Sequence, residues 1–244
     1  MTILISNDDG VFAPGIAALV QAFSKAGHEV IVCAPDSQRS AASHSLTLGR
    51  PLTVRETPFP GAAKAYAIGG TPADCVKLGM MVLCPQAQAV VSGVNKGYNA
   101  GTDILYSGTV AAALEGAICG VPAMAVSQAA ERTDYVRASE LAVSLFDRMM
   151  AQPLEALCVM NVNYPACDEI KGVTAALTGQ IHYTETYSLI EHDGERAYVL
   201  SGGVDHTKAQ SDDYEKLRAG YATVTIVHAD LTDRHASNFW KTLL

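Results

Sequence analysis

Two adjacent carboxylates near the N-terminus are the residues best suited to chemistry. Residues 3–10 are Ile-Leu-Ile-Ser-Asn-Asp-Asp-Gly, so an apolar run ends in the pair Asp8 and Asp9. Two neighbouring anions repel each other unless a cation or a proton holds them together. Because carboxylate oxygens are natural ligands of hard divalent metals, the pair predicts a metal site. The alternative is that these residues only cap a helix, since Asp is a good N-cap residue.

The apolar run before this pair indicates which element positions it. Such a run is typical of a strand buried on both faces of a parallel sheet. In open α/β sheets, ligands bind at the carboxyl ends of the strands. Three more polar segments can share this edge, because each follows a predicted strand.

The first segment, residues 36–45, is a loop rich in hydroxyl groups that contains Arg39 and Ser40. It could supply an oxygen ligand or cover a phosphate. On its own it also fits a flexible surface loop. We expect His44, within it, to be solvated.

The second segment, residues 92–101, combines three glycines with Asn95 and Asn99. Glycine permits close backbone approach, and Asn side chains can coordinate or hydrogen-bond through their carbonyl oxygens. A plain loop is the alternative. The chain has neither G-x-G-x-x-G nor G-x-x-x-x-G-K-[ST], which disfavours dinucleotide and P-loop sites.

The third segment is Ser107-Gly108-Thr109, which opens an alanine-rich helix. The N–H groups of a helix start, with two hydroxyls beside them, can bind an anion, although Ser and Thr are also ordinary N-caps. Together the four segments favour a hard metal and a ligand that carries phosphate. The chain has no G-x-S-x-G elbow and no H-E-x-x-H pair to indicate a serine or zinc hydrolase.

Composition narrows the class of protein. The 244 residues are 49% hydrophobic and 17% charged, as in a globular protein with a substantial core. The formal net charge of −8 argues against a general nucleic-acid binder. No stretch approaches the ~20 apolar residues of a membrane span. The six cysteines are scattered and no leader is evident, so we expect a cytoplasmic protein without membrane contact.

Strand-like and helix-like segments alternate from residue 3 to about 165, which predicts a doubly wound α/β core. After the N-terminal strand, the expected strands are Val30–Ala34, Ala65–Ile68, Ala89–Ser92, Ala123–Val126 and Cys158–Val162. Four helices are expected in this part of the chain. The first contains Ile16 to Phe23, the second begins at Thr71, and the third runs from Ser107 to Gly120. The fourth carries Leu141, Leu145 and Met149 on one face.

The pattern changes beyond residue 166. Segments 173–177, 196–200 and 222–228 are β-like, and polar stretches such as 182–188 and 191–196 separate them. Short helices are expected at 212–219 and 236–244. We therefore predict one domain over 1–244, in which residues 1–165 form the core with the active site. Residues 166–244 form an extension that includes a hairpin or arm.

Several of these motifs together resemble the SurE family of survival-protein nucleotidases. The resemblance covers most of residues 2–127. The matching blocks are residues 5–10, 13–15, 34–36, 39–40, 43, 45–47, 70–75, 92–101 and 106–113, with weaker matches at 161–165 and 220–221.

The resemblance implies a Rossmann-like, three-layer α/β/α sandwich with a mostly parallel sheet and a C-terminal arm. It further implies a phosphatase of nucleoside 5′-monophosphates, and often 3′-monophosphates, with short polyphosphate as a substrate of some members. One divalent ion, Mg²⁺ or Mn²⁺, is the implied cofactor. Members are homodimers or homotetramers that exchange C-terminal elements.

The family's functional positions fall on residues of the required type. The implied metal ligands are Asp8, Asp9, Ser40 and Asn95, and the implied phosphate contacts are Asn99, Ser107, Gly108 and Thr109. Asp8 and Asp9 are also the implied catalytic residues. Whether an Asp attacks phosphorus or acts as a base toward water stays open.

Two positions depart from the family pattern. Phe12 stands where a polar residue is common, and Ala41 replaces the usual Gly after Ser40. Neither is a presumed ligand.

Two other functions are compatible with the sequence: a non-catalytic, oligomeric nucleotide sensor, and a metal-dependent glycosyltransferase, which can also pair Asp residues near nucleotide phosphates.

Overall fold

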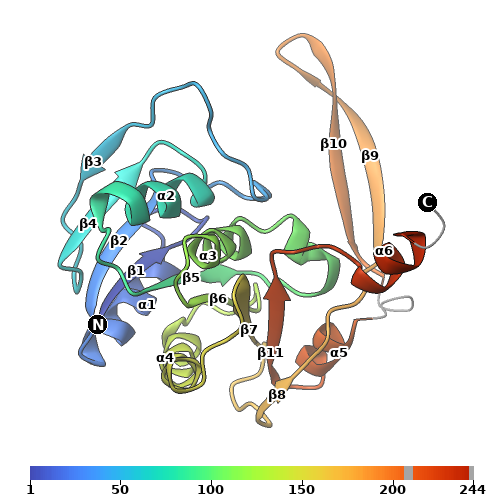
Figure 1. Cartoon of the computed structure of the whole chain (residues 1–244). Coiled ribbons are helices and arrows are strands. Elements are labelled where there is room, and N and C mark those ends of the chain that lie inside the picture. The colour runs from blue at the N-terminus through green and yellow to red at the C-terminus, as the bar shows by residue number, and fades with distance from the viewer. Residues whose placement is uncertain (206–210, 242–244) are drawn as a thin grey trace.

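A nine-stranded sheet forms the centre of the protein (Figure 1). The computed structural model describes residues 1–205 and 211–241. The strand order is β3-β4-β2-β1-β5-β6-β7-β11-β8. All neighbours are parallel except β3 with β4 and β7 with β11.

The main sheet includes two strands from the last third of the chain. Its strands are β1 (Thr2–Ser6), β2 (Glu29–Pro35), β3 (Val54–Glu56), β4 (Lys64–Ile68), β5 (Ala89–Lys96), β6 (Ala123–Gln128), β7 (Cys158–Tyr164), β8 (Val173–Ala175) and β11 (Ala222–His228). The helices are α1 (Pro14–Lys25), α2 (Pro72–Leu78), α3 (Gly108–Ile118), α4 (Val136–Ala151), α5 (Asp212–Arg218) and α6 (Arg234–Lys241), with single-turn segments η1 (Gly79–Leu83) and η2 (Gly101–Leu105).

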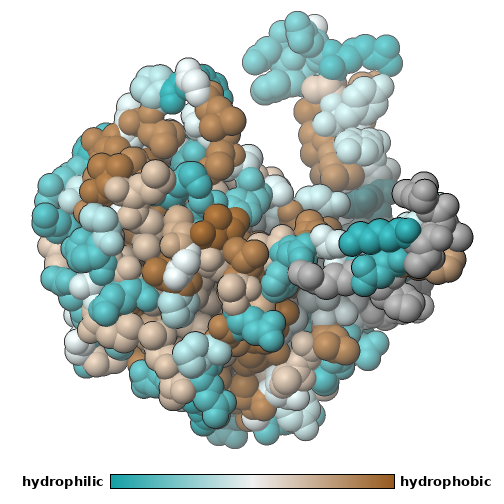
Figure 2. All heavy atoms as spheres, viewed as in Figure 1, coloured by the Kyte–Doolittle hydropathy of each residue, from teal (hydrophilic) through white to brown (hydrophobic). Residues whose placement is uncertain are grey.

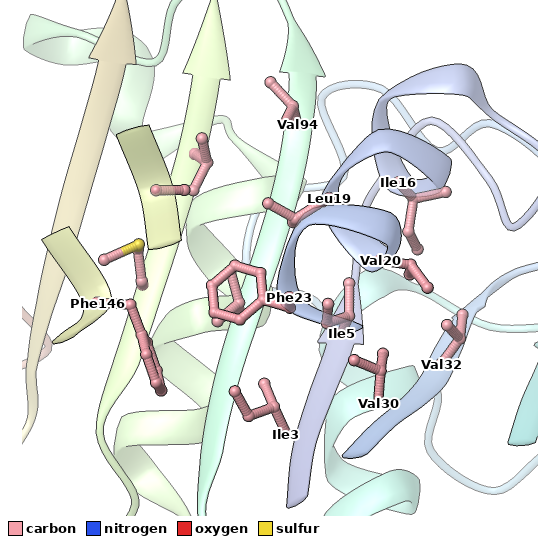
Figure 3. Close-up of a cluster of buried hydrophobic side chains, with 14 of the residues drawn as sticks. Ile3, Ile5, Ile16, Leu19, Val20, Phe23, Val30, Val32, Val94 and Phe146 are labelled. Atoms are coloured by element: carbon pink, nitrogen blue, oxygen red, sulfur yellow. The ribbon is translucent and has the colours of Figure 1, made fainter. Parts of the chain in front are cut away.

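Two hydrophobic cores lie on opposite faces of the sheet. Alternation along β1 sends Ile3 and Ile5 to the face covered by α1 and α4, where they pack with Phe23 and Phe146 (Figure 3). Leu4 points to the other face, which α2 and α3 cover. The sheet therefore forms the middle layer of an α/β/α sandwich, as the sequence predicted.

The order of the strands fixes where a ligand can bind. From β1 the chain goes first to β2 and β4 on one side, and then returns to β5 on the other side of β1. The strand order thus reverses between β1 and β5, and the crevice at the carboxyl ends of such a pair is where open α/β sheets bind ligands. Asp8 and Asp9 follow β1, and Asn95 lies near the end of β5.

Strands β9 (Tyr183–His192) and β10 (Glu195–Val204) form a separate antiparallel hairpin. Figure 1 shows it projecting from the rest of the protein, and Figure 2 shows hydrophilic residues at its tip. The hairpin or arm expected in this third of the chain is thus present, but the polar stretches 182–188 and 191–196, expected to separate strands, are themselves largely part of β9 and β10. All ten residues of β9 are exposed, and its apolar residues alternate with Thr, Glu and Ser rather than forming a buried run.

The other predicted elements agree with the structure apart from their ends. The strand expected at Ala89–Ser92 continues to Lys96 through a register shift between Ser92 and Asn95. Strand β3 was not predicted, because it has three exposed residues and no pattern. Residues 242–244 of the expected terminal helix lie outside the described residues. Within the described chain, no helix is long and apolar enough to cross a membrane.

Candidate active site

Asp8 is a buried carboxylate in contact with the start of α3. Asp8 is only 6% exposed, and its Oδ1 accepts a 2.6 Å hydrogen bond from the Thr109 hydroxyl. Burial raises the pKa of Asp8 to about 6; the Thr109 hydrogen bond opposes this shift and neighbouring Asp9 adds to it. The protein therefore holds a costly anion in one orientation, which is typical of a site built for a cation.

The start of α3 approaches Asp8 closely because residue 108 has no side chain. A Cβ at Gly108 would lie 2.8 Å from the Cβ of Asp8, well inside normal contact. Ser107 is the N-cap of the helix, and its hydroxyl accepts the N–H of Val110 at 3.1 Å. The first turn of α3, with its positive dipole end, is thus fixed beside the carboxylate.

Asp9 is less buried than Asp8 and borders open space. Its Oδ2 accepts a long hydrogen bond, 3.4 Å, from the backbone N–H of Lys96. Burial also raises the pKa of Asp9. Beside it is a hollow of about 560 Å³, whose lining includes Phe12 and Tyr135. Asp9 is therefore the carboxylate of the pair that faces room for a ligand.

Two other chain segments meet the aspartates. The N–H of Arg39 donates to the carbonyl of Asp8 at 2.7 Å, which brings the loop that carries Ser40 to the end of β1. Ser40 is exposed, and its hydroxyl accepts a hydrogen bond from Gln38 at 2.8 Å. Asn95 donates its amide nitrogen to the Gly97 carbonyl at 2.9 Å, so its carbonyl oxygen is the atom that remains for a ligand.

Comparisons with known proteins place the chain and its fold in one family. The family model for survival protein SurE matches residues 3–185. The chain belongs to the SurE family.

Full-length relatives share both the sequence and the fold. The 5′-nucleotidase SurE of Clostridium beijerinckii is 42% identical over 241 residues, which is 96% of this chain and 95% of the relative. The enzyme of the same name from Clostridium botulinum Eklund 17B is 40% identical over 240 residues, with the same coverage. The crystal structure of SurE protein from Aquifex aeolicus superimposes with a TM-score of 0.84 at 35% identity, covering 100% of this chain and 99% of that one.

The remaining predicted site residue, Asn99, is part of a buried amide network in this SurE-family chain. Its Nδ2 donates to Ser127 Oγ at 2.8 Å, and its backbone N–H donates to the Asn163 side chain at 2.8 Å. The amides of Asn161 and Asn163 both donate to its carbonyl, at 2.8 and 2.9 Å. The backbone of Asn99 is thereby fixed at the ends of β6 and β7.

The donor set expected of a SurE-type metal centre suits a hard cation. It consists of two carboxylates, one hydroxyl and one amide carbonyl, so every ligand atom is oxygen, the preference of Mg²⁺ and Mn²⁺. Among the described residues, no group of three or more His, Cys, Asp or Glu side chains could hold a metal. The expected set contains only two carboxylates, so it also needs the oxygens of Ser40 and Asn95.

Sequence reasoning missed the residues that hold the site together. His44 is not simply solvated, as predicted: its Nε2 lies 2.9 Å from Oε2 of buried Glu115. Glu115 gave no signal, because a single acid in an alanine-rich helix is usually on a solvated face. A signal did exist for Asn161 and Asn163, since two amides interrupt an otherwise apolar strand.

Proposed function

We propose that this protein is a metal-dependent 5′-nucleotidase that hydrolyses nucleoside 5′-monophosphates to nucleoside and phosphate. Nucleoside 3′-monophosphates and short polyphosphate are proposed as further substrates. The observation that carries the proposal is the buried Asp8 carboxylate, held by Thr109 beside the start of α3. A carboxylate beside the start of a helix suits a cation next to a phosphate group. The relatives named 5′-nucleotidase support the same activity.

The proposed metal ligands are Asp8, Asp9, Ser40 and Asn95. A bound Mg²⁺ or Mn²⁺ supplies a Lewis acid that polarises a phosphoryl group and makes a water molecule more acidic. Thr109 occupies Oδ1 of Asp8, so the second oxygen of that carboxylate is the one available to the ion.

The phosphate-binding residues come from α3 and from the loop before it. Ser107, Gly108 and Thr109 present the first turn of the helix, whose N–H groups and dipole stabilise negative charge on the phosphoryl oxygens. The Asn99 side chain completes the cradle, and its fixed backbone limits the reorganisation that the reaction needs.

Two roles are open to the aspartates in the chemical step. One of them attacks phosphorus and forms an aspartyl phosphate, or one of them accepts a proton from an attacking water. Asp9 borders the open hollow, so we assign the proton-accepting role to it. Rapid acid quench during turnover tests this assignment, because an aspartyl-phosphate adduct would overturn it.

A substrate and metal panel tests the proposed function. Phosphate release from AMP and GMP should stop with EDTA and return with Mn²⁺ or Mg²⁺. Release from 3′-AMP and tripolyphosphate decides the broader substrate range. Tight binding of nucleotide without any release would instead identify a nucleotide sensor.

Substitution of Asp8 tests the proposed site directly. Asp8→Asn removes the charge without changing the shape, and we expect phosphate release to be lost while the circular dichroism spectrum is retained. Asp193→Asn makes the same change on a side chain that is 91% exposed in the hairpin turn, and it should keep full activity. Near-normal activity of Asp8→Asn would show that the ligand set is wrong.

We propose that the protein works as a homodimer or homotetramer that exchanges C-terminal elements. Support comes from the hairpin, where Tyr187, Leu189 and Tyr198 are exposed. Phe239 and Trp240 of α6 are also exposed.

A reducing cytoplasm is the proposed compartment, because all six cysteines are free thiols.

A further inference from the structure

The loop that carries Ser40 has no regular structure to hold it in place. Residues 36–53, between β2 and β3, contain no helix and no strand. Ala41 and Ser43 both have positive φ angles, 54° and 52°, which L-residues adopt at a cost. The conformation of this loop therefore depends on bonds to the rest of the protein.

Glu115 makes one of those bonds from inside the protein. It lies on α3, seven residues from Gly108, and is only 2% exposed. Its Oε2 meets Nε2 of His44 in the loop at 2.9 Å, and its Oε1 meets Nζ of Lys77 on α2 at 2.5 Å. These two partners lower the pKa of Glu115 against the opposing effect of burial.

Joining two helices through a buried carboxylate carries a high desolvation free energy. Desolvation of an ion pair costs about as much as its attraction returns, and an apolar residue of similar size often serves stability as well or better. Packing of α2 on α3 alone thus does not require an acid at position 115. What the acid adds is a directional bond to His44, four residues after Ser40.

The same helix provides the phosphate-binding turn. Hydrogen bonds from Ser43 to Tyr106 and Leu105, at 3.0 and 2.8 Å, attach the loop just before that turn. The Glu115–His44 contact attaches it two turns further along α3. The loop is therefore held at one point just before α3 and at one point on α3, the helix that also orients Asp8 through Thr109.

We propose that Glu115 and His44 are positioning residues that set the place of Ser40 relative to Asp8 and so determine the affinity of the metal site. This inference rests on the proposed function, in which Ser40 is a ligand. Neither residue is among the proposed metal ligands or phosphate contacts. Partners of this kind that orient metal ligands typically contribute roughly 10-fold or more to metal affinity.

Mn²⁺ binding to the full-length protein, measured by titration calorimetry without substrate, tests the proposal. His44→Ala should raise the Mn²⁺ Kd about tenfold. His44→Gln, whose amide nitrogen can still donate to Glu115, should restore most of the affinity. Lys77→Met is the matched control: it removes the other partner of Glu115 but does not touch the loop, so it should leave the Kd unchanged even if the melting temperature falls.

A double-substitution cycle distinguishes the proposal from a general structural effect. If His44 acts through Ser40, His44→Ala should have no further effect on Kd in a Ser40→Ala background. If His44→Ala weakens Mn²⁺ binding equally in both backgrounds, the proposal is overturned. It is also overturned if Ser40→Ala raises the Kd while His44→Ala leaves it unchanged. An unchanged Kd for Ser40→Ala would instead remove Ser40 from the ligand set of the proposed function, and the positioning role would fall with it.

Discussion

Asp8 shows how one residue can be made ready for a cation. Burial alone would favour its protonated form, and its pKa lies at about 6, above the usual value. Thr109, which is fully buried, donates to one oxygen and favours the ionised form. The carboxylate is thus kept in one orientation by a neutral hydroxyl, so that its charge is left for the proposed metal ion.

Thr109→Val should weaken metal binding by about tenfold, because it removes the hydroxyl that orients Asp8 while keeping the branched shape. Thr109→Ser keeps the hydroxyl and is the matched control. Mn²⁺ titration of both variants checks this. Equal affinities of the Val and Ser variants would show that the bond to Asp8 does not orient the ligand.

Ala41→Gly should stabilise the fold by about 1 kcal/mol, because position 41 has a φ of 54° and a Cβ is costly in that region. The gain is partly offset by the greater freedom of Gly in the unfolded chain. Urea unfolding monitored by circular dichroism measures the change. A loss of stability would mean that the unfolded-state cost exceeds the strain.

At the scale of elements, α2 is fixed by a capping box that also holds the Ser40 loop. Asp74 accepts hydrogen bonds from the N–H of Thr71 at 2.9 Å, and from the N–H and hydroxyl of Thr47 at 2.9 and 2.7 Å. Thr71 in turn caps the N–H of Asp74. One buried acid therefore serves both a helix start and the loop.

Asp74→Asn should lower the free energy of unfolding by about 1 kcal/mol at pH 7. Although burial alone would raise the pKa of Asp74, the bonds from Thr47 and Thr71 keep it below the ordinary 3.8. The ionised acid thus stabilises the fold fully above about pH 4, and this contribution is lost as the pH falls through the lower folded value. Chemical unfolding at pH 7 and pH 3 should show the gap between wild type and variant shrinking on acidification; a constant gap would contradict the linkage.

The sequence predicted the elements better than the bonds between them. Strands buried on both faces, such as β1 and β6, are continuous apolar runs, and the capping box at Thr71 marks a helix start. The hairpin strands lack a continuous apolar run, because none of the residues of β9 is buried among the described residues. The contact between His44 and Glu115 spans 71 residues, and no local pattern encodes a pairing that distant.

The turn at Asn99–Gly101 is held in place by a residue from the C-terminal third of the chain. Asp213 on α5 is fully buried, and its Oδ2 accepts the N–H of Gly101 at 2.9 Å. Asp213→Ala should therefore impair turnover of AMP, chiefly through a higher KM, because the turn that carries Asn99 loses an anchor. Glu215→Ala, at an exposed position of the same helix, is the control. Unchanged kinetics for Asp213→Ala would show that the bond from α5 to Gly101 does not affect the site.

At the scale of the whole molecule, the hairpin β9–β10 is almost entirely exposed among the described residues. A two-stranded hairpin is marginally stable in water unless a further surface covers it. Leu189 pairs with Tyr198 and Tyr187 pairs with Leu200, so one face of the hairpin carries four large apolar side chains. Each is between 49% and 67% exposed. A second copy of the chain is the surface that the proposed oligomer provides.

Replacing Leu189 and Leu200 by Ser should shift the mass measured by light scattering after size-exclusion chromatography toward the monomer. The reason is that both side chains lie on the apolar face, where association would bury them. Thr186→Ala with Ser201→Ala changes a cross-strand pair on the opposite face and should leave the mass unchanged. An unchanged oligomer in the Ser variant would mean that the contacts between subunits lie elsewhere, and that the hairpin is held by other means.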